Sequence, residues 1–368
     1  MKVTTTPKDF VKVNTILPIM QEHFGNHMNL ARIKLMALLL HALCVVQTVS
    51  LHKLAAAMPT SLDRDSNLRR LQRFIAKYAL SLDIVARMIF SLLPCKDKLV
   101  LSMDRTNWKF GDFNINILMV GLTYKGIAFP LIFSLLDKRG NSNWEERKKL
   151  MERFISLFGA DCIDCLVADR EFIGKEWIGW LNIMRIRYYI RIKQNFWVIR
   201  PSTGEKLRAW WLFNDLKLGQ EKFHYKLFIM KGEYVYLSGS RLKNSAGVPE
   251  LQILISFNRP EEGISQYKRR WQIETAFRAM KSSGFNIEDT HLRDMERISR
   301  LVAMVCIAMV WAYLVGDHKD MNIKPIRILK HGRRAKSIVK YGLEEISNVL
   351  LRPTYTPKFD VFKFLSCT

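Results

Sequence analysis

Residues 98–110 read KLVLSMDRTNWKF, an apolar, β-prone run interrupted by Asp104. Two further runs of similar character follow after short turns, INILMVGLTY at 115–124 and IAFPLIFSLL at 127–136. Runs of this length that are separated by glycine-containing turns are typical of strands. The sequence therefore predicts an antiparallel meander of three strands, with Asp104 on the first of them.

A second acidic residue follows a buried strand later in the chain. Residues 144–159 have the pattern of an amphipathic helix, opened by Ser142 or Asn143 and stopped by a glycine, and the strand DCLVAD then ends at Asp169. If this strand lies parallel to and beside the first strand of the meander, Asp169 and Asp104 converge at neighbouring strand ends. A helix at 175–186 and a strand at 187–192 are expected after it.

A third acidic residue stands in a basic segment with helical character, YKRRWQIETAFRAMK at 267–281. Tyr267, Arg270, Glu274 and Lys281 are separated by 3, 4 and 7 residues, which places all four on one face of a helix. A carboxylate suited to a metal ion then lies between two cations suited to phosphates. An ordinary solvated helix face is the alternative.

Three carboxylates form a ligand set that suits Mg²⁺ or Mn²⁺ better than zinc. Two such ions, about 3.5–4 Å apart, activate a water molecule or a 3′-hydroxyl and stabilise the leaving oxygen. Neither a P-loop nor a G-x-S-x-G motif competes with this interpretation. The single CxxC motif lacks a second pair, so we expect no zinc site and a reducing compartment. The cysteines are Cys44, Cys95, Cys162, Cys165, Cys306 and Cys367.

The charge of the chain favours a polyanionic partner. Lys and Arg number 58 against 34 Asp and Glu, a formal net charge of +24. Nucleic acid is the first candidate and an anionic membrane surface the second. Residues 301–316 are uncharged but too short for a typical membrane span, so we expect a buried helix and no membrane association. The first residues lack the apolar core of a signal peptide, and a cytoplasmic location is expected.

Residues 1–97 have helical character and are expected to bind DNA. A short helix at 51–58, a polar turn and a second helix at 66–80, capped by Asp65 or Ser66, resemble a helix-turn-helix reader. Its basic side chains are candidate DNA contacts, although a solvated face is the alternative. They are Arg69, Arg70 and Arg73.

The rest of the chain divides by composition. Residues 196–258 alternate β-like runs with turns and predict a β-rich insertion. An apolar helix is expected at 295–315, and residues 319–368 form a basic tail with eight Lys and Arg between positions 319 and 340.

The pattern Y-x2-R-x3-E-x6-K, together with the segments DRTNW and ADREF, resembles the IS4-family DDE transposases of bacterial insertion sequences. The resemblance covers nearly the whole chain. It implies an α/β fold with an RNase H-like catalytic core, a mixed sheet flanked by helices, at 98–195 and 259–318, with the β-rich insertion between its parts and an α-helical N-terminal domain. It also implies metal binding by Asp104, Asp169 and Glu274, and contacts of Tyr267, Arg270 and Lys281 with transposon-end phosphates.

The same resemblance implies a function. The enzyme would bind terminal inverted repeats, cleave at transposon ends and join the 3′-hydroxyls to target DNA with two Mg²⁺ or Mn²⁺ ions. Its partners would be double-stranded DNA, from the ends and the target, and a second copy in a homodimer on paired ends, in the bacterial cytoplasm at the nucleoid. The other function classes are a non-catalytic DNA-binding regulator from a decayed element and an RNase H-fold nuclease without strand transfer.

Some members of the family stack a flipped base on a tryptophan shortly before the glutamate helix. The corresponding strand here, LQILISFN, has none. Trp271, Trp210 and Trp211 are the candidate substitutes, although a place in the core is the alternative for each. The sequence does not decide whether the reaction passes through a DNA hairpin intermediate. Glu171 follows the second aspartate closely but is expected to lie beyond the site, and Asn107 either orients the metal site or belongs to a turn.

Overall fold

The computed structural model describes residues 8–94, 96–244, 246–330, 332–352 and 354–366, with only the backbone for residues 8–12. Cys95 and Cys367 lie outside the described residues, as do the ends of the predicted N-terminal region and basic tail. The chain forms two compact units. Unit 1 comprises residues 1–94, 107–115 and 276–368, and unit 2 comprises residues 95–106 and 116–275.

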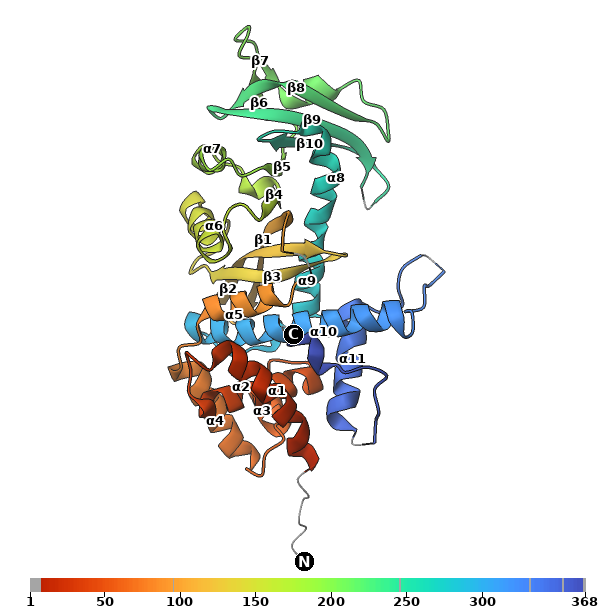
Figure 1. Ribbon diagram of the computed structural model, residues 1–368. Coiled ribbons are helices and arrows are strands. Elements are labelled where there is room, and N and C mark those ends of the chain that lie inside the picture. The colour runs from red at the N-terminus through yellow and green to blue at the C-terminus, as the bar shows by residue number, and fades with distance from the viewer. Residues whose placement is uncertain (1–7, 95, 245, 331, 353, 367–368) are drawn as a thin grey trace, which may run out of the picture. The chain divides into compact units, whose positions relative to one another are not determined.

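Unit 1 is built mainly from helices, and those between residues 8 and 91 agree with the helical character predicted for residues 1–97, as far as the structure describes them. Its helices are α1 (Lys8–Phe24), α2 (Leu30–Val46), α3 (Leu51–Ala56), α4 (Arg64–Lys77), α5 (Leu82–Ser91), α10 (Met295–Asn322) and α11 (Ile338–Leu351) (Figure 1).

Helix α4 starts earlier than its sequence suggests. Asp63 is the N-cap, and its carboxylate accepts hydrogen bonds from both the backbone N–H and the hydroxyl of Ser66, each at 2.8 Å. The predicted caps, Asp65 and Ser66, therefore lie inside the first turn. Three adjacent candidates for a cap compete here, and Asp63 satisfies the free N–H groups of the first turn.

The apolar helix α10 is the centre of unit 1. By length and composition it could cross a membrane, but 83% of its most apolar window is buried within the protein. It packs against α11 so closely that a Cβ atom on Gly342 would lie 1.8 Å from the carbonyl oxygen of Ala312. The burial agrees with the prediction of a core helix.

Unit 2 contains a large mixed sheet. The strands are β1 (Leu99–Phe110), β2 (Phe113–Tyr124), β3 (Ile127–Leu135), β4 (Ile163–Ala168), β5 (Tyr188–Ile192), β6 (Trp197–Ile199), β7 (Lys206–Arg208), β8 (Glu221–Met230), β9 (Glu233–Lys243) and β10 (Pro249–Ser256). Their order is β3-β2-β1-β4-β5-β10-β9-β8-β6-β7. β1, β4 and β5 are parallel neighbours, whereas β2 pairs antiparallel with β3. The tips of β1 and β2 belong to unit 1.

Helices flank this sheet. They are α6 (Trp144–Phe158), α7 (Lys175–Ile183) and α8 (Gly263–Tyr267). Figure 1 shows α6 and α7 on one side of the sheet and α8 on the other. α6 begins with a capping box between Asn143 and Glu146 and ends at Gly159, as its sequence predicts.

The predicted β-rich insertion is an extension of the same sheet. Its last strand, β10, pairs antiparallel with β5, with Ile255 opposite Ile190. After β5 the chain forms β6 and β7 at the far edge of the sheet and returns through β8 and β9 to β10, beside β5. The next segment begins there. That segment runs through α8, one turn of 3₁₀-helix at Lys268–Arg270, and α9 (Trp271–Lys281), whose last six residues belong to unit 1.

Candidate active site

The two aspartates follow paired residues of neighbouring parallel strands. Met103 on β1 is the partner of Ala168 on β4. Asp104 and Asp169 are the next residues along each strand direction. The prediction that these two strands are adjacent and parallel is confirmed, and side chains at equivalent positions of parallel neighbours lie side by side. Asp169 directly follows β4, whereas Asp104 lies within β1, which continues to Phe110, and not at a strand end as predicted.

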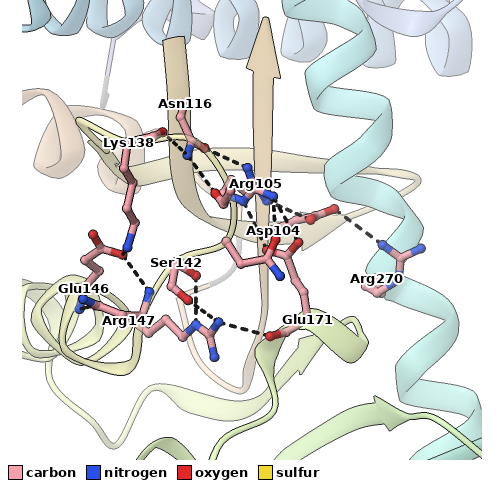
Figure 2. Close-up of polar contacts among 12 residues, drawn as sticks. Asp104, Arg105, Asn116, Lys138, Ser142, Glu146, Arg147, Glu171 and Arg270 are labelled. Atoms are coloured by element: carbon pink, nitrogen blue, oxygen red, sulfur yellow. Dashed lines mark hydrogen bonds and ion pairs between the residues drawn. The ribbon is translucent and has the colours of Figure 1, made fainter. Parts of the chain in front are cut away.

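Arg270 joins the third acidic residue to the first. Its Nη2 donates to Oε1 of Glu274 at 2.7 Å, and its Nη1 lies 3.5 Å from Oδ2 of Asp104. Figure 2 shows the guanidinium reaching from the helical segment towards Asp104 on β1. The 3₁₀ turn that carries Arg270 is held at this strand, because the buried hydroxyl of Ser102 donates to the backbone oxygen of Arg270 at 3.4 Å.

The side chain of Arg270 is almost completely buried, with 5% of its surface exposed. Its Nε has no hydrogen-bond partner among the described residues. One face of the guanidinium lies 4.5 Å from the ring centre of Trp271, whose own side chain is exposed. A buried cation therefore holds two carboxylates and keeps one donor unused.

The carboxyl group of Asp104 is unusually reluctant to ionise. Burial raises its pKa to about 6, although the N–H of Arg105 and the charge of Arg270 act in the opposite direction. The nearby charges of Glu171 and Glu274 raise this pKa further. Asp104 thus lies in a cluster of negative charge that favours a cation.

Asp169 has a different set of partners. Its Oδ1 accepts a hydrogen bond from the N–H of Arg170 at 2.7 Å and one from the hydroxyl of Tyr267 at 3.3 Å. Tyr267 is 3% exposed and packs against Leu254 and Ile264. The tyrosine therefore orients Asp169 from beneath the surface, and its predicted contact with a DNA phosphate stays a prediction.

Glu171 was predicted to lie beyond the site, but its charge acts on Asp104. Arg105 donates to both carboxylate oxygens of Glu171, each at 3.4 Å, and to the side-chain oxygen of Asn116 at 3.1 Å (Figure 2). Arg147 donates to the backbone oxygen of Glu171 at 3.1 Å. The prediction assumed that the strand ends at Asp169 and that the chain then carries Glu171 beyond the site, but residues 170–172 form a 3₁₀ turn that keeps Glu171 near Asp104.

The donor chemistry of this cluster fits a divalent ion, although the side-chain arrangement is not that of a preformed site. Among the described residues, no group of three His, Cys, Asp or Glu side chains is arranged to hold a metal ion. Between Asp104 and Glu274, the guanidinium of Arg270 occupies the place that a metal ion would take. Carboxylate oxygens are the ligands that Mg²⁺ and Mn²⁺ prefer.

Lys281, the last residue of the motif, belongs to unit 1. Its Nζ donates to the backbone oxygen of Asn107 at 3.1 Å and lies 2.9 Å from Oε1 of Glu288. The ring centre of Trp108 is 5.5 Å away. Asn107 thus contributes its backbone oxygen to Lys281, and its predicted role at the metal site stays a prediction.

The basic helix α4 lines a cavity of about 660 Å³ in unit 1. Four cations surround this cavity, three from α4 and one from the first turn of α10: Arg69, Arg73, Lys77 and Arg297. Arg70 is turned away from it and donates to the side-chain oxygen of Asn67 at 3.3 Å. The structure thus separates Arg70 from the other two predicted DNA contacts of this helix.

Exposed aromatic side chains accompany cations on the sheet extension. Trp197 is 44% exposed, and the guanidinium of Arg208 lies 3.8 Å from its ring centre, with Lys206 at 5.1 Å. Trp210 and Trp211 are also exposed and lie with their ring centres 5.1 Å apart. Trp197 was not among the predicted site residues, although Trp, Lys and Arg on two paired strands were a usable signal.

A family model matches the central part of the chain. Residues 146–311 match the transposase DDE domain. The match includes Asp169, Arg270 and Glu274 and leaves Asp104 outside it. No curated protein matches the chain. The domain match supports a transposase, an enzyme that cleaves DNA.

Proposed function

We propose that this protein is the DDE transposase of an insertion sequence of the IS4 family. It binds terminal inverted repeats, cleaves DNA at the transposon ends and joins the 3′-hydroxyls to target DNA. Besides the domain match, one observation supports the proposal. Asp104 and Asp169 follow paired residues of two parallel strands, and Arg270 links Asp104 to Glu274. The strand order β3-β2-β1-β4-β5 supports the RNase H-like character of the core.

The three carboxylates are the proposed metal ligands. Asp104, Asp169 and Glu274 would hold two Mg²⁺ or Mn²⁺ ions, which activate the attacking water or hydroxyl and stabilise the leaving oxygen when bound. Tyr267 orients Asp169 through its hydroxyl, and Arg105 fixes Glu171 near Asp104. Burial of Asp104 raises its pKa, and a bound cation would favour its ionised form.

DNA contacts are proposed on both units. In unit 1, the cations around the cavity at α4 contact backbone phosphates of the end. In unit 2, the exposed rings of Trp210, Trp211 and Trp271 offer surfaces for stacking on bases. The net charge of +24 supplies long-range attraction to DNA.

Assembly on DNA follows from the reaction. Two ends must be joined to one target, so we propose a homodimer that forms on paired ends. Protomers with a charge of +24 each repel one another until DNA lies between them. Light scattering with and without an end-containing duplex tests this. A tight dimer without DNA contradicts it.

The central test uses the DNA that flanks the gene. An end-containing duplex should be cleaved in Mg²⁺ and, with a target plasmid, should yield joined products. Cleavage without joined products identifies a nuclease. Binding of the duplex without cleavage, in Mg²⁺ and in Mn²⁺, identifies a DNA-binding regulator and rejects the proposed activity.

A further inference from the structure

The guanidinium of Arg270 lies between two of the proposed metal ligands, Asp104 and Glu274. The guanidinium of Arg270 makes its shorter contact with Glu274, at 2.7 Å, and its longer contact with Asp104, at 3.5 Å. A divalent ion that uses both carboxylates needs the negative charge that this guanidinium now balances. Arg270 and such an ion therefore compete for the same two partners.

Arg270 also has donors to offer another partner. A guanidinium carries five N–H donors in a planar fork that matches two oxygens of a phosphate. In this structure its Nε is buried and has no partner among the described residues, and the contact of Nη1 with Asp104 is long. A phosphate oxygen would accept a hydrogen bond from this Nε–H, which neither carboxylate does.

The backbone of Arg270 is held at β1 by the hydroxyl of Ser102, so the side chain alone has to turn. The exposed ring of Trp271 lies 4.5 Å from the guanidinium and offers it a flat surface. The side chain can therefore leave Asp104 without displacing the helical segment.

We propose that Arg270 is a positioning residue that couples metal binding to DNA binding at the site of the proposed transposase. Without DNA, its guanidinium occupies Asp104 and Glu274 and keeps divalent ions weakly bound. A DNA phosphate draws the guanidinium away, and the two carboxylates become free for the ions. Because such coupling is reciprocal, divalent ions also strengthen the binding of DNA through this residue.

The test measures Mn²⁺ binding to the full-length protein by titration calorimetry and by the paramagnetic resonance signal of free Mn²⁺. Without DNA, Arg270→Gln should bind Mn²⁺ about 10-fold more tightly than the unchanged protein. The exposed neighbour Arg269 supplies the matched control, since Arg269→Gln removes the same charge from the same turn and should change nothing. The double variant Asp104→Asn, Arg270→Gln should bind Mn²⁺ no more tightly than the unchanged protein.

A second titration measures Mn²⁺ binding to the unchanged protein with a short duplex added. The double variant Asp104→Asn, Asp169→Asn with the same duplex gives the reference for ions bound by the DNA alone. The duplex should raise the Mn²⁺ affinity of the unchanged protein and leave that of Arg270→Gln the same. If Arg270→Gln does not fold, as circular dichroism would reveal, Arg270→Met, which keeps the length of the side chain and removes its charge, takes its place in both titrations.

The failures of the two proposals are distinguishable. The coupling is overturned if Arg270→Gln and the unchanged protein bind Mn²⁺ with equal affinity. It is also overturned if Arg269→Gln raises the Mn²⁺ affinity as much as Arg270→Gln does. Either result leaves the proposed function intact, provided that Mn²⁺ binding still depends on Asp104. An affinity of the unchanged protein that the duplex does not alter overturns it too. Absence of Mn²⁺ binding from every variant, with or without DNA, rejects the proposed metal-dependent function as well.

Discussion

The hydroxyl of Tyr267 donates a hydrogen bond to Oδ1 of Asp169 across 3.3 Å, between residues 98 positions apart in the chain. The ring is buried among Leu254 and Ile264, so the hydroxyl is the one polar group that the tyrosine side chain presents to the site. A residue that orients a metal ligand affects the reaction differently from one that grips DNA.

Tyr267→Phe should therefore lower the rate of end cleavage by about 10- to 100-fold and leave the affinity for end DNA unchanged. The ring still fills its place in the core, and only the hydrogen-bond donor to Asp169 is removed. Single-turnover cleavage and gel-shift titration measure the two quantities. Weaker DNA binding at an unchanged cleavage rate would show instead that the hydroxyl contacts a phosphate.

The three proposed ligands should be individually essential. Asp104→Asn, Asp169→Asn and Glu274→Gln should each reduce cleavage in Mg²⁺ by about three orders of magnitude or more, because each removes a ligand, and should bind end DNA nearly as well as the unchanged protein. Asp137→Asn, at an exposed position of unit 2, is the control and should cleave normally. A ligand variant with normal cleavage removes that residue from the set.

The cavity at α4 predicts a split among the arginines of one helix. Arg69→Ala with Arg73→Ala should weaken end binding and reduce the slope of log affinity against log salt by about one unit for each phosphate that the protein no longer binds. Arg70→Ala is the matched control, because Arg70 donates to Asn67 and does not line the cavity. If Arg70→Ala weakens binding as much as the changes at Arg69 and Arg73, the phosphate-binding residues lie elsewhere on α4.

The pKa of Asp104 predicts a dependence of stability on pH. Its pKa is about 6 in the folded protein against 3.8 for an unperturbed aspartate, so the folded state favours the neutral form. The associated stability is present below about pH 4 and is lost as the pH rises through 6. Asp104→Asn should thus unfold at higher denaturant concentration than the unchanged protein at pH 7.5, by about 1–3 kcal/mol, with no difference near pH 4. Equal stabilities at pH 7.5 would contradict this.

The contact between α10 and α11 predicts a steric effect in unit 1. A Cβ atom on Gly342 would lie 1.8 Å from the oxygen of Ala312 and 2.7 Å from the nitrogen of Gly316, both backbone atoms. Gly342→Ala should destabilise the protein by about 1–3 kcal/mol or more, since the helices must separate. Thermal unfolding measures the effect. Ser347→Ala, at a half-buried position of the same helix, should change little, and an unchanged melting temperature of Gly342→Ala would contradict the close packing.

Local features of the chain determined much of the candidate site in advance. The alternation of β-prone and helical runs predicted that Asp104 and Asp169 lie on strands, and the structure confirms that these strands are parallel neighbours. The cap and the end of α6 were also predictable, because Asn143 and Gly159 act on residues within one turn of themselves. Short-range hydrogen bonds of this kind depend only on nearby sequence.

The tertiary structure alone decided what surrounds those residues. Arg270 meets Asp104 across 166 positions of sequence, and Arg105 meets Glu171 across 66. The position of the sheet extension is equally non-local, since it rests on the pairing of β10 with β5. Helical spacing places Arg270 near Glu274 but says nothing of the strand opposite. Burial, ion pairing and the raised pKa of Asp104 arise only when distant segments exclude water from one another. The sequence by itself specified the carboxylates and Arg270, but only the tertiary structure placed the guanidinium between Asp104 and Glu274.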